Sequence, residues 1–145
     1  MNLGYIDDGD WMDYNVKVST AGLYTFSFRV ANSYGNGRIE IRTESGSVLG
    51  GVDVPRTGGW QNWSTVSTTA TLAAGSQTLR IYVVSGSFNF NWLEVDLPLA
   101  AQNILSRIEA EDYFAMQGIQ SEPTVDTGGA STSPGSMPVT GWIIT

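Results

Sequence analysis

Hydrophobic and polar residues alternate along most of the chain. Between Tyr24 and Val30 every second residue is large and apolar, and the residues between them are polar. Residues 14–18, 38–42 and 79–83 follow the same period. A period of two places successive side chains on opposite faces of a strand. Each run therefore predicts a strand that buries one face and exposes the other.

Turn-forming stretches separate these runs at short intervals. Residues 33–37, 44–47 and 73–76 are rich in glycine, serine and other small or polar residues. We find no segment with a convincing helical period. Short alternating strands divided by regularly spaced turns are typical of sandwiches and jelly rolls. The pattern predicts an all-β fold, an antiparallel β-sandwich of the jelly-roll type.

The alternation is interrupted after residue 96. Residues 97–106 include Pro98, which cannot join a central strand, and we interpret them as a connector. Alternation resumes over 107–113. Residues 130–145 begin with a run of Ser, Thr, Gly and Pro, which predicts a flexible tail. The β-prone last five residues are either an added edge strand or a loose end. We therefore predict a single domain over residues 1–129.

Composition narrows the possible chemistry. The chain has 145 residues, a net charge of −7 and only seven Lys plus Arg, which argues against nucleic-acid and anionic-membrane partners. It has no Cys and no His, so disulfides, thiolate nucleophiles, histidine bases and Cys/His zinc sites are excluded. Cation sites built from carboxylate oxygens stay possible.

Three stretches place aromatic or amide side chains beside glycines at strand ends. They span residues 2–11, 56–63 and 85–92. A sugar presents apolar C–H faces and a rim of hydroxyls, so its site needs a flat aromatic platform and fixed polar groups. Tyr5 and Trp60 are candidates for the platform. Asn89 offers both a donor and an acceptor.

Some of these residues also have a purely structural interpretation. Trp11 and Trp92 lie in apolar runs and are predicted to be core. Trp63 begins a strand, where it either joins the core or buttresses Trp60. Asn89 also suits a turn.

Five motifs together resemble the family 6 carbohydrate-binding modules. They are Gly4-Tyr5-Ile6-Asp7-Asp8-Gly9-Asp10-Trp11, Gly58-Gly59-Trp60-Gln61 with Trp63, Ala74-Gly75-Ser76-Gln77-Thr78-Leu79, Phe88-Asn89-Phe90-Asn91-Trp92 and Ile108-Glu109-Ala110-Glu111-Asp112-Tyr113. The resemblance covers nearly all of residues 2–129. It implies a non-catalytic module that binds plant or algal cell-wall polysaccharide of the xylan or β-glucan type. It also implies a secreted, extracellular setting within a larger glycoside hydrolase.

The order of the motifs departs from that family. Its modules open with the segment that resembles residues 108–111 and close with the one that resembles Asn91-Trp92. This chain is therefore either a circular permutant or the back of one tandem module (1–96) joined to the front of the next (107–129). The ten connector residues can span the gap at up to about 3.3 Å each. We predict that the strand from about Arg107 packs into the same sandwich in a monomer, with a strand-swapped dimer as the alternative.

The resemblance assigns binding roles residue by residue. In the family the tyrosine and tryptophan that match Tyr5 and Trp60 clasp a sugar, and the asparagine that matches Asn89 hydrogen-bonds it. Glu122 matches a glutamate that sometimes tunes specificity. The expected sugar site is therefore Tyr5, Trp60, Asn89 and Glu122.

The resemblance also implies a structural Ca²⁺ ion. Glu109 and Glu111 share one face of a predicted strand, where like charges repel unless they are solvated or bridged by a cation. Asp96 ends the preceding strand. In the family a calcium ion lies where the first and last strands meet, and these three residues match its ligands. A backbone carbonyl near Gly129 is a further expected ligand, and a solvated acidic strand is the alternative.

Two other classes of protein compete with this interpretation. A glycoside hydrolase needs two carboxylates about 5 Å or about 6.5–9.5 Å apart on either side of the scissile bond. Asp7, Asp8, Asp10 and Asp13 crowd into one loop and strand start, and only Glu122 joins the aromatic group. A protein-binding or adhesive sandwich would also explain exposed aromatics. The sequence favours a non-catalytic carbohydrate-binding module.

Overall fold

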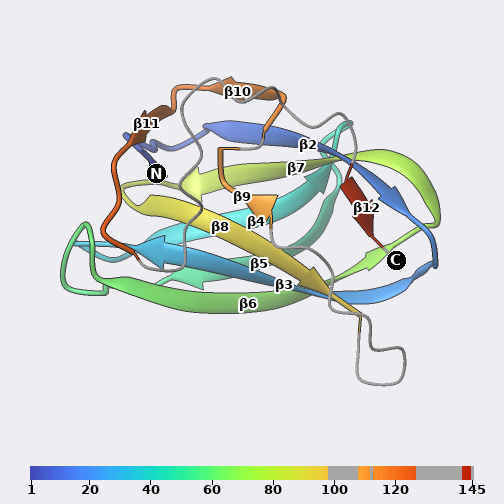
Figure 1. Cartoon of the computed structure of the whole chain (residues 1–145), viewed down its shortest axis with the longest axis horizontal. Coiled ribbons are helices and arrows are strands. Elements are labelled where there is room, and N and C mark those ends of the chain that lie inside the picture. The colour runs from blue at the N-terminus through green and yellow to red at the C-terminus, as the bar shows by residue number, and fades with distance from the viewer. Residues whose placement is uncertain (98–107, 112, 127–141, 145) are drawn as a thin grey trace.

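The computed structural model consists of β-strands in two facing sheets (Figure 1). It describes residues 1–97, 108–111, 113–126 and 142–144. These residues contain no helix, and so none that could cross a membrane. The strands are β1 (Asn2–Gly4), β2 (Trp11–Val18), β3 (Gly22–Ala31), β4 (Gly37–Thr43), β5 (Val48–Val54), β6 (Trp63–Leu72), β7 (Gly75–Ser85), β8 (Asn89–Asp96), β9 (Ile108–Glu109), β10 (Ala115–Gln117), β11 (Gln120–Glu122) and β12 (Trp142–Ile144).

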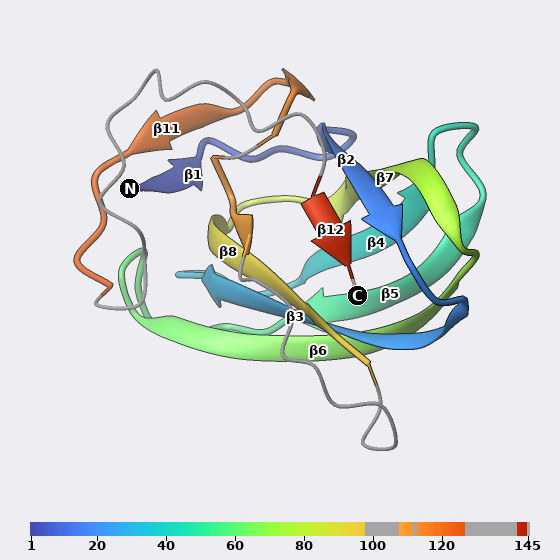
Figure 2. The same ribbon diagram turned by 45° about the vertical axis from the view of Figure 1, so that its right-hand side comes forward.

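The two sheets form the predicted antiparallel sandwich. One has the order β11-β1-β8-β3-β6, with β9 paired to β8. The other has the order β10-β2-β7-β4-β5, with β12 paired to β2. All of these pairs are antiparallel except β12 with β2. Figure 2 shows the two layers curving over each other.

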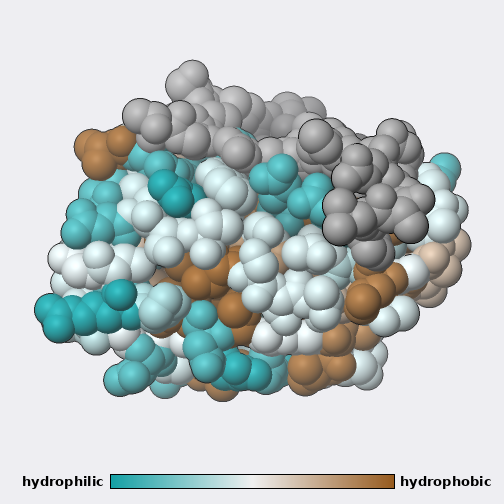
Figure 3. Space-filling model, turned by 90° about the horizontal axis from the view of Figure 1, so that it is seen from below, coloured by the Kyte–Doolittle hydropathy of each residue, from teal (hydrophilic) through white to brown (hydrophobic). Residues whose placement is uncertain are grey.

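The core follows the alternation along the strands. On β3, Tyr24, Phe26, Phe28 and Val30 are all 0% exposed, whereas the polar residues between them are half-buried on the outer face. Strand β6 carries exposed serine and threonine at every second position from residue 65 to 71. Figure 3 shows the face below β6, where hydrophobic residues occur in small groups among polar ones.

One core prediction is correct and another is wrong. Trp92 is buried, as predicted. Trp11 is only half-buried because Met12 beside it takes the core-facing position of β2. Its ring instead lies under the guanidinium of Arg80, with the Cζ atom 4.0 Å from the ring centroid. This is a cation–π contact on the outer face of the sheet.

The segment after the connector pairs with strands from the first part of the chain. In β9, Ile108 lies opposite Leu93 of β8, and β10 and β11 pair with β2 and β1. Ile108, Ala110 and Ile119 are all buried in the common core. The connector residues 98–107 lie outside the described part of the chain. Figure 2 shows β11 beside β1.

Of the predicted tail, residues 130–145, the structure describes only residues 142–144. Residues 127–141 lie outside the described residues. Strand β12 pairs in parallel with β2, and its Ile143 lies opposite Lys17. Of the two interpretations of the last residues, the structure has the added edge strand.

The topology brings four distant segments to one end of the sandwich. Strand β1 ends there, and β8 begins beside it, since Leu3 lies opposite Phe90. Strand β11 lies antiparallel to β1, with Asn2 opposite Glu122. The loop between β5 and β6 meets β3 at the same end, where Ala31 lies opposite Trp63. Figure 1 shows this end on the left.

Replacing Ile108 by alanine tests whether the segment after the connector completes the core. Ile108 is 2% exposed, and removing a buried isoleucine side chain beyond Cβ typically costs about 2–5 kcal/mol of stability. We expect Ile108→Ala to lower the free energy of unfolding by that amount in urea denaturation. Val125→Ala, at a position 75% exposed, is the control and leaves stability unchanged. Equal stability of both variants would show that the segment does not pack in the core.

Candidate carbohydrate-binding site

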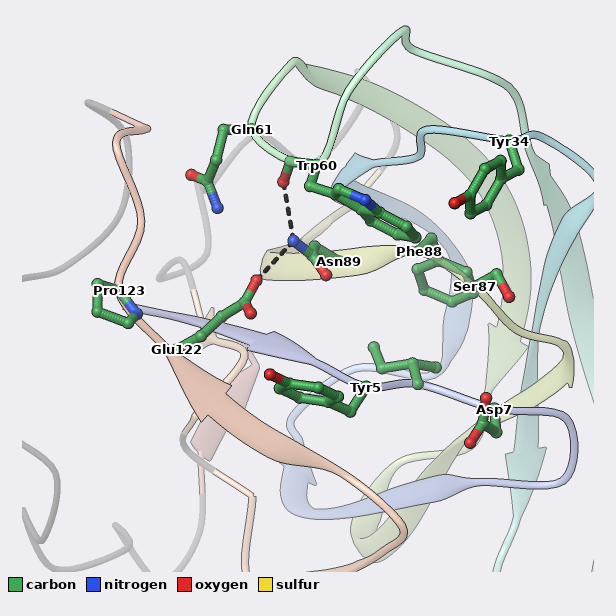
Figure 4. Close-up of a pocket in the computed structure, with 11 residues that line it drawn as sticks. Tyr5, Asp7, Tyr34, Trp60, Gln61, Ser87, Phe88, Asn89, Glu122 and Pro123 are labelled. Atoms are coloured by element: carbon green, nitrogen blue, oxygen red, sulfur yellow. Dashed lines mark hydrogen bonds between the residues drawn. The ribbon is translucent and has the colours of Figure 1, made fainter.

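A pocket of about 560 Å³ opens where the distant segments meet. Its size falls within the range of about 300–1,000 Å³ usual for small-molecule sites. Its walls include Tyr5, Tyr34, Trp60, Asn89 and Glu122. The structure therefore brings together the four residues predicted to form the sugar site. In Figure 4 the rings of Tyr5 and Trp60 lie on opposite sides of the pocket, with Asn89 and Glu122 between them.

Tyr5 reaches the pocket through an unusual backbone conformation. It follows the end of β1 with φ of 56°, in the left-handed region that few residues other than glycine adopt. Its side chain is 67% exposed. Two hydrogen bonds hold the following loop, from Ser87 N to the Ile6 oxygen at 2.7 Å and from Gly86 N to Asp8 Oδ1 at 2.7 Å. Strained backbone of this kind clusters at functional sites.

Trp60 lies in the loop between β5 and β6. It is 40% exposed, and its backbone oxygen accepts a hydrogen bond from Asn89 Nδ2 at 2.8 Å. Trp63 is half-buried, and its Nε1 donates to Gln61 Oε1 at 3.3 Å. Trp63 is therefore not a core residue, and it hydrogen-bonds Gln61, the residue next to Trp60.

Asn89 is held in one orientation. It is 4% exposed, and its Nδ2 donates both to the Trp60 oxygen at 2.8 Å and to Glu122 Oε1 at 2.6 Å. An amide nitrogen has two hydrogens, so both are used within the protein. Only the carbonyl oxygen is left for a ligand. The sequence suggested a donor and an acceptor at this position, whereas the structure offers an acceptor alone.

Glu122 joins the pocket from β11. Its Oε1 also accepts a hydrogen bond from Nδ2 of Asn2, at 2.8 Å, and Asn2 is 0% exposed. Gly4 makes room for this carboxylate, because a Cβ atom there would lie 2.8 Å from the Glu122 Cδ atom. The roles of Asn2 and Gly4 toward Glu122 could not be predicted from the sequence, since both depend on the cross-strand partner.

Gln61 ties three segments of the site together. Its Nε2 donates to Asn2 Oδ1 at 3.3 Å. Its Oε1 accepts from Thr124 Oγ1 at 3.1 Å and from the backbone nitrogen of Val125 at 2.9 Å. The loop that carries Trp60 is therefore bonded to β1 and to the residues after Glu122.

Tyr34 is a pocket residue that the sequence did not reveal. It is 73% exposed, and its ring centroid lies 5.4 Å from that of Trp60 at an interplanar angle of 83°. Such edge-to-face pairs are favourable for aromatic rings. The sequence marked residues 33–37 only as a turn, because a single aromatic in a glycine-rich turn has no periodicity.

Most of the acidic residues near Tyr5 make contacts that support the fold. Asp10 Oδ2 accepts from the Asp7 backbone nitrogen at 2.9 Å. Both oxygens of Asp13 accept from Arg80, at 2.7 and 2.8 Å, and the hydrogen-bonded Asp13 carboxylate raises the pKa of the Arg80 guanidinium. Asp8 Oδ1 caps the Gly86 nitrogen. The carboxylates that line the pocket are those of Asp7 and Glu122.

The predicted calcium ligands do not all lie together. Glu109 lies opposite Trp92 of β8. Asp96 is four residues further along that strand, a distance of about 13 Å at about 3.3 Å per residue. Glu111 lies on the other side of Glu109 in this antiparallel pairing, with Oε1 3.9 Å from the Met1 nitrogen. Within the described ranges no group of three His, Cys, Asp or Glu side chains could hold a metal ion. The segment around Gly129 lies outside these ranges.

Comparisons with known sequences agree with the motifs. A family model described as "Carbohydrate binding module (family 6)" matches residues 1–96. The Clotting factor G alpha subunit of Tachypleus tridentatus is 37% identical over 132 residues, which is 85% of this chain and 20% of the relative. An Arabinoxylan arabinofuranohydrolase of Paenibacillus polymyxa is 35% identical over 119 residues, 77% of this chain and 18% of the relative. The chain spans about a fifth of the length of these relatives.

Solved structures agree as well. A module of Cellvibrio mixtus lichenase 5A in complex with cellotriose has a TM-score of 0.63 and 38% identity, covering 66% of this chain and 76% of that one. A family 6 module of Clostridium cellulolyticum in complex with xylose has a TM-score of 0.61 and 29% identity, covering 66% and 78%. Because the family's motifs, its sandwich and its sequence model coincide in one molecule, the chain belongs to the family 6 carbohydrate-binding modules.

Proposed function

We propose that this chain binds plant or algal cell-wall polysaccharide of the xylan or β-glucan type in the pocket between Tyr5 and Trp60. The observation that carries this proposal is the pair of exposed rings on opposite sides of a pocket that holds Asn89 and Glu122 (Figure 4). The apolar faces of a pyranose pack on the two rings, and its hydroxyls meet the polar groups between them. Related modules solved with cellotriose, xylose and cellobiose support the choice of ligand.

The hydrogen bonds within the site indicate which groups the ligand must supply. Asn89 has only its Oδ1 left for a ligand, and the carboxylate of Glu122 offers acceptor oxygens as well. The bound sugar therefore donates hydroxyl protons to both residues. A hydroxyl that donates to a carboxylate makes a charge-assisted hydrogen bond, which is shorter and stronger than a neutral one. A sugar with two neighbouring free hydroxyls fits this arrangement.

We propose that the module is non-catalytic and works within a larger, secreted glycoside hydrolase. The engagement of Asp8, Asp10 and Asp13 in the fold leaves Asp7 and Glu122 as the carboxylates of the pocket. Relatives named as arabinofuranohydrolases and xylanases match this chain over 18–24% of their length. This share supports a binding module attached to a separate catalytic part.

Replacing Trp60 by alanine tests the stacking mechanism. Truncating a central aromatic in an interface commonly costs at least about 2 kcal/mol of binding free energy, or about 30-fold in Kd. We expect at least this loss in isothermal titration against the xylo- or gluco-oligosaccharide that the wild type binds. Because Trp60 is 40% exposed, the melting temperature stays nearly unchanged.

Phe114→Ala is the matched control for this experiment. Phe114 is an exposed aromatic, at 45%, outside the pocket lining. The control keeps the wild-type Kd. Unfolding of Trp60→Ala would show that Trp60 serves the core, and unchanged affinity in a folded Trp60→Ala would refute the stacking mechanism.

Replacing Gly4 by alanine tests the position of Glu122. The backbone of Gly4 lies outside the left-handed region, so alanine is not strained there, but its Cβ would lie 2.8 Å from Glu122 Cδ. The carboxylate must leave its observed position, which disturbs its hydrogen bond with Asn89. We expect a loss of about tenfold in affinity, as for one hydrogen bond to a charged group. Gly22→Ala is the control, since its Cβ would meet nothing closer than a Leu97 methyl at 4.0 Å. Equal affinity of the two variants would mean that Glu122 does not need its observed position.

We also propose a structural calcium ion held in part by Glu109 and Glu111. Ca²⁺ takes six to eight oxygen ligands, of which these carboxylates supply a share, and Asp96 is too distant to join them. A ligand that binds only the folded state at about 100 times its Kd adds about 2.7 kcal/mol of stability.

Chelation tests the calcium proposal. We expect EDTA to lower the melting temperature by about 5–10 °C relative to excess calcium. The double variant Glu109→Gln and Glu111→Gln loses this dependence on calcium. A melting temperature that does not change with chelator would rule out the ion.

A further inference from the structure

A second cavity adjoins the sugar pocket. Its volume is also about 560 Å³, and it shares Tyr34 with the first. Its walls include Arg38, Asp53, Arg56 and Ser85. We propose that this cavity is a second subsite, which takes a sugar unit that bears a carboxylate, such as a uronic acid. This inference rests on the proposed function, because the same saccharide occupies both cavities.

Tyr34 is the wall common to both cavities, and buried hydrogen bonds hold its loop in place. Asn32 is 0% exposed, and its Oδ1 accepts from the backbone nitrogens of Tyr34 and Gly35 at 2.9 and 2.8 Å. Its backbone oxygen accepts from the nitrogens of Thr57 and Gly58 at 2.8 and 3.2 Å. One residue thus anchors the loop of Tyr34 and the loop that leads to Trp60. A ring fixed before binding costs little ordering entropy when a ligand arrives.

The charges of the two cavities differ. The first cavity is lined by the carboxylates of Asp7 and Glu122, and its described lining contains no Lys or Arg. The second cavity contains the two arginines Arg38 and Arg56 and one carboxylate, Asp53, so positive charge is in excess there although the chain's net charge is −7. An anionic group is therefore repelled from the first cavity and attracted to the second.

The two arginines have different surroundings. Arg38 is paired with Asp53, with Nη1 2.7 Å from Oδ1, so its guanidinium is already engaged. Arg56 is exposed, and its Cβ lies 3.3 Å from the position of a Cβ on Gly35. Among the described residues it has no ion-pair partner. Arg56 is therefore the arginine with donors left for a ligand.

These features match a carboxylate-bearing sugar. Guanidinium binds carboxylate through two parallel N–H···O bonds. The exposed ring of Tyr34 offers an apolar surface for the pyranose, as Trp60 and Tyr5 do in the first pocket. A polysaccharide can place a neutral sugar in the first pocket and an acid-bearing sugar beyond Tyr34. It then contacts the groups of both cavities. The module then prefers acid-substituted xylan or glucan over the unsubstituted polymer.

Isothermal titration with matched oligosaccharides tests this preference. The probes are xylotetraose with and without one glucuronic acid branch, and cellotetraose with and without one glucose oxidised to glucuronic acid. In the series that the wild type binds, we expect the acidic member to bind about fivefold more tightly at low salt, as for one partly exposed ion pair. Arg56→Gln abolishes this preference and leaves the affinity for the neutral member unchanged. Added salt weakens the preference in the wild type.

Lys17→Gln is the control variant. Lys17 is exposed on β2 and lies outside both cavity linings, so this change removes one positive charge while the preference stays. One outcome is that the wild type binds the neutral tetrasaccharide and binds the acidic one no more tightly. That result refutes the second subsite, while the proposed function stands. A preference that survives Arg56→Gln also refutes it. If no tetrasaccharide binds, the proposed function fails and the second subsite fails with it.

Discussion

The hydrogen bonds that the Glu122 carboxylate accepts hold the polar side of the proposed binding site in place. One oxygen of this carboxylate accepts hydrogen bonds from Asn89 at 2.6 Å and from Asn2 at 2.8 Å. The bond from Asn89 uses one hydrogen of its amide, whose other hydrogen bonds the backbone oxygen of Trp60. A buried amide that is bonded in this way has one orientation, so the acceptor offered to a sugar is fixed before the ligand binds.

These hydrogen bonds also explain why the unusual motif order is compatible with a complete module. Glu122 belongs to the segment that follows the connector, whereas Asn2 and Asn89 precede it. The pairing of β11 with β1 brings them together, and burial of Ile108 and Ile119 in the shared core stabilises that arrangement. The pocket therefore depends on packing between segments rather than on their order along the chain.

Much of the fold and of the candidate site could be predicted from the sequence. What could not be predicted has physical causes. A period of two identifies strands such as β3, whose buried face is the predicted one. The resemblance pointed to Tyr5, Trp60, Asn89 and Glu122, which line one pocket in the structure. Side-chain orientation needs tertiary partners, so the restriction of Asn89 to an acceptor and the outward ring of Trp11 were not predictable. Tyr34 was missed because only its contact with Trp60 marks it. The spacing between Asp96 and Glu109 follows from strand register, which sequence pattern alone leaves open.

In the proposed mechanism a sugar occupies the space between Tyr5 and Trp60. A crystal structure of the chain with xylotetraose or cellotetraose would show where the sugar lies. We expect one pyranose ring stacked between the two aromatic rings, with hydroxyls within about 3 Å of Asn89 Oδ1 and of the Glu122 carboxylate. An oligosaccharide bound elsewhere, with this pocket left vacant, would refute binding between Tyr5 and Trp60.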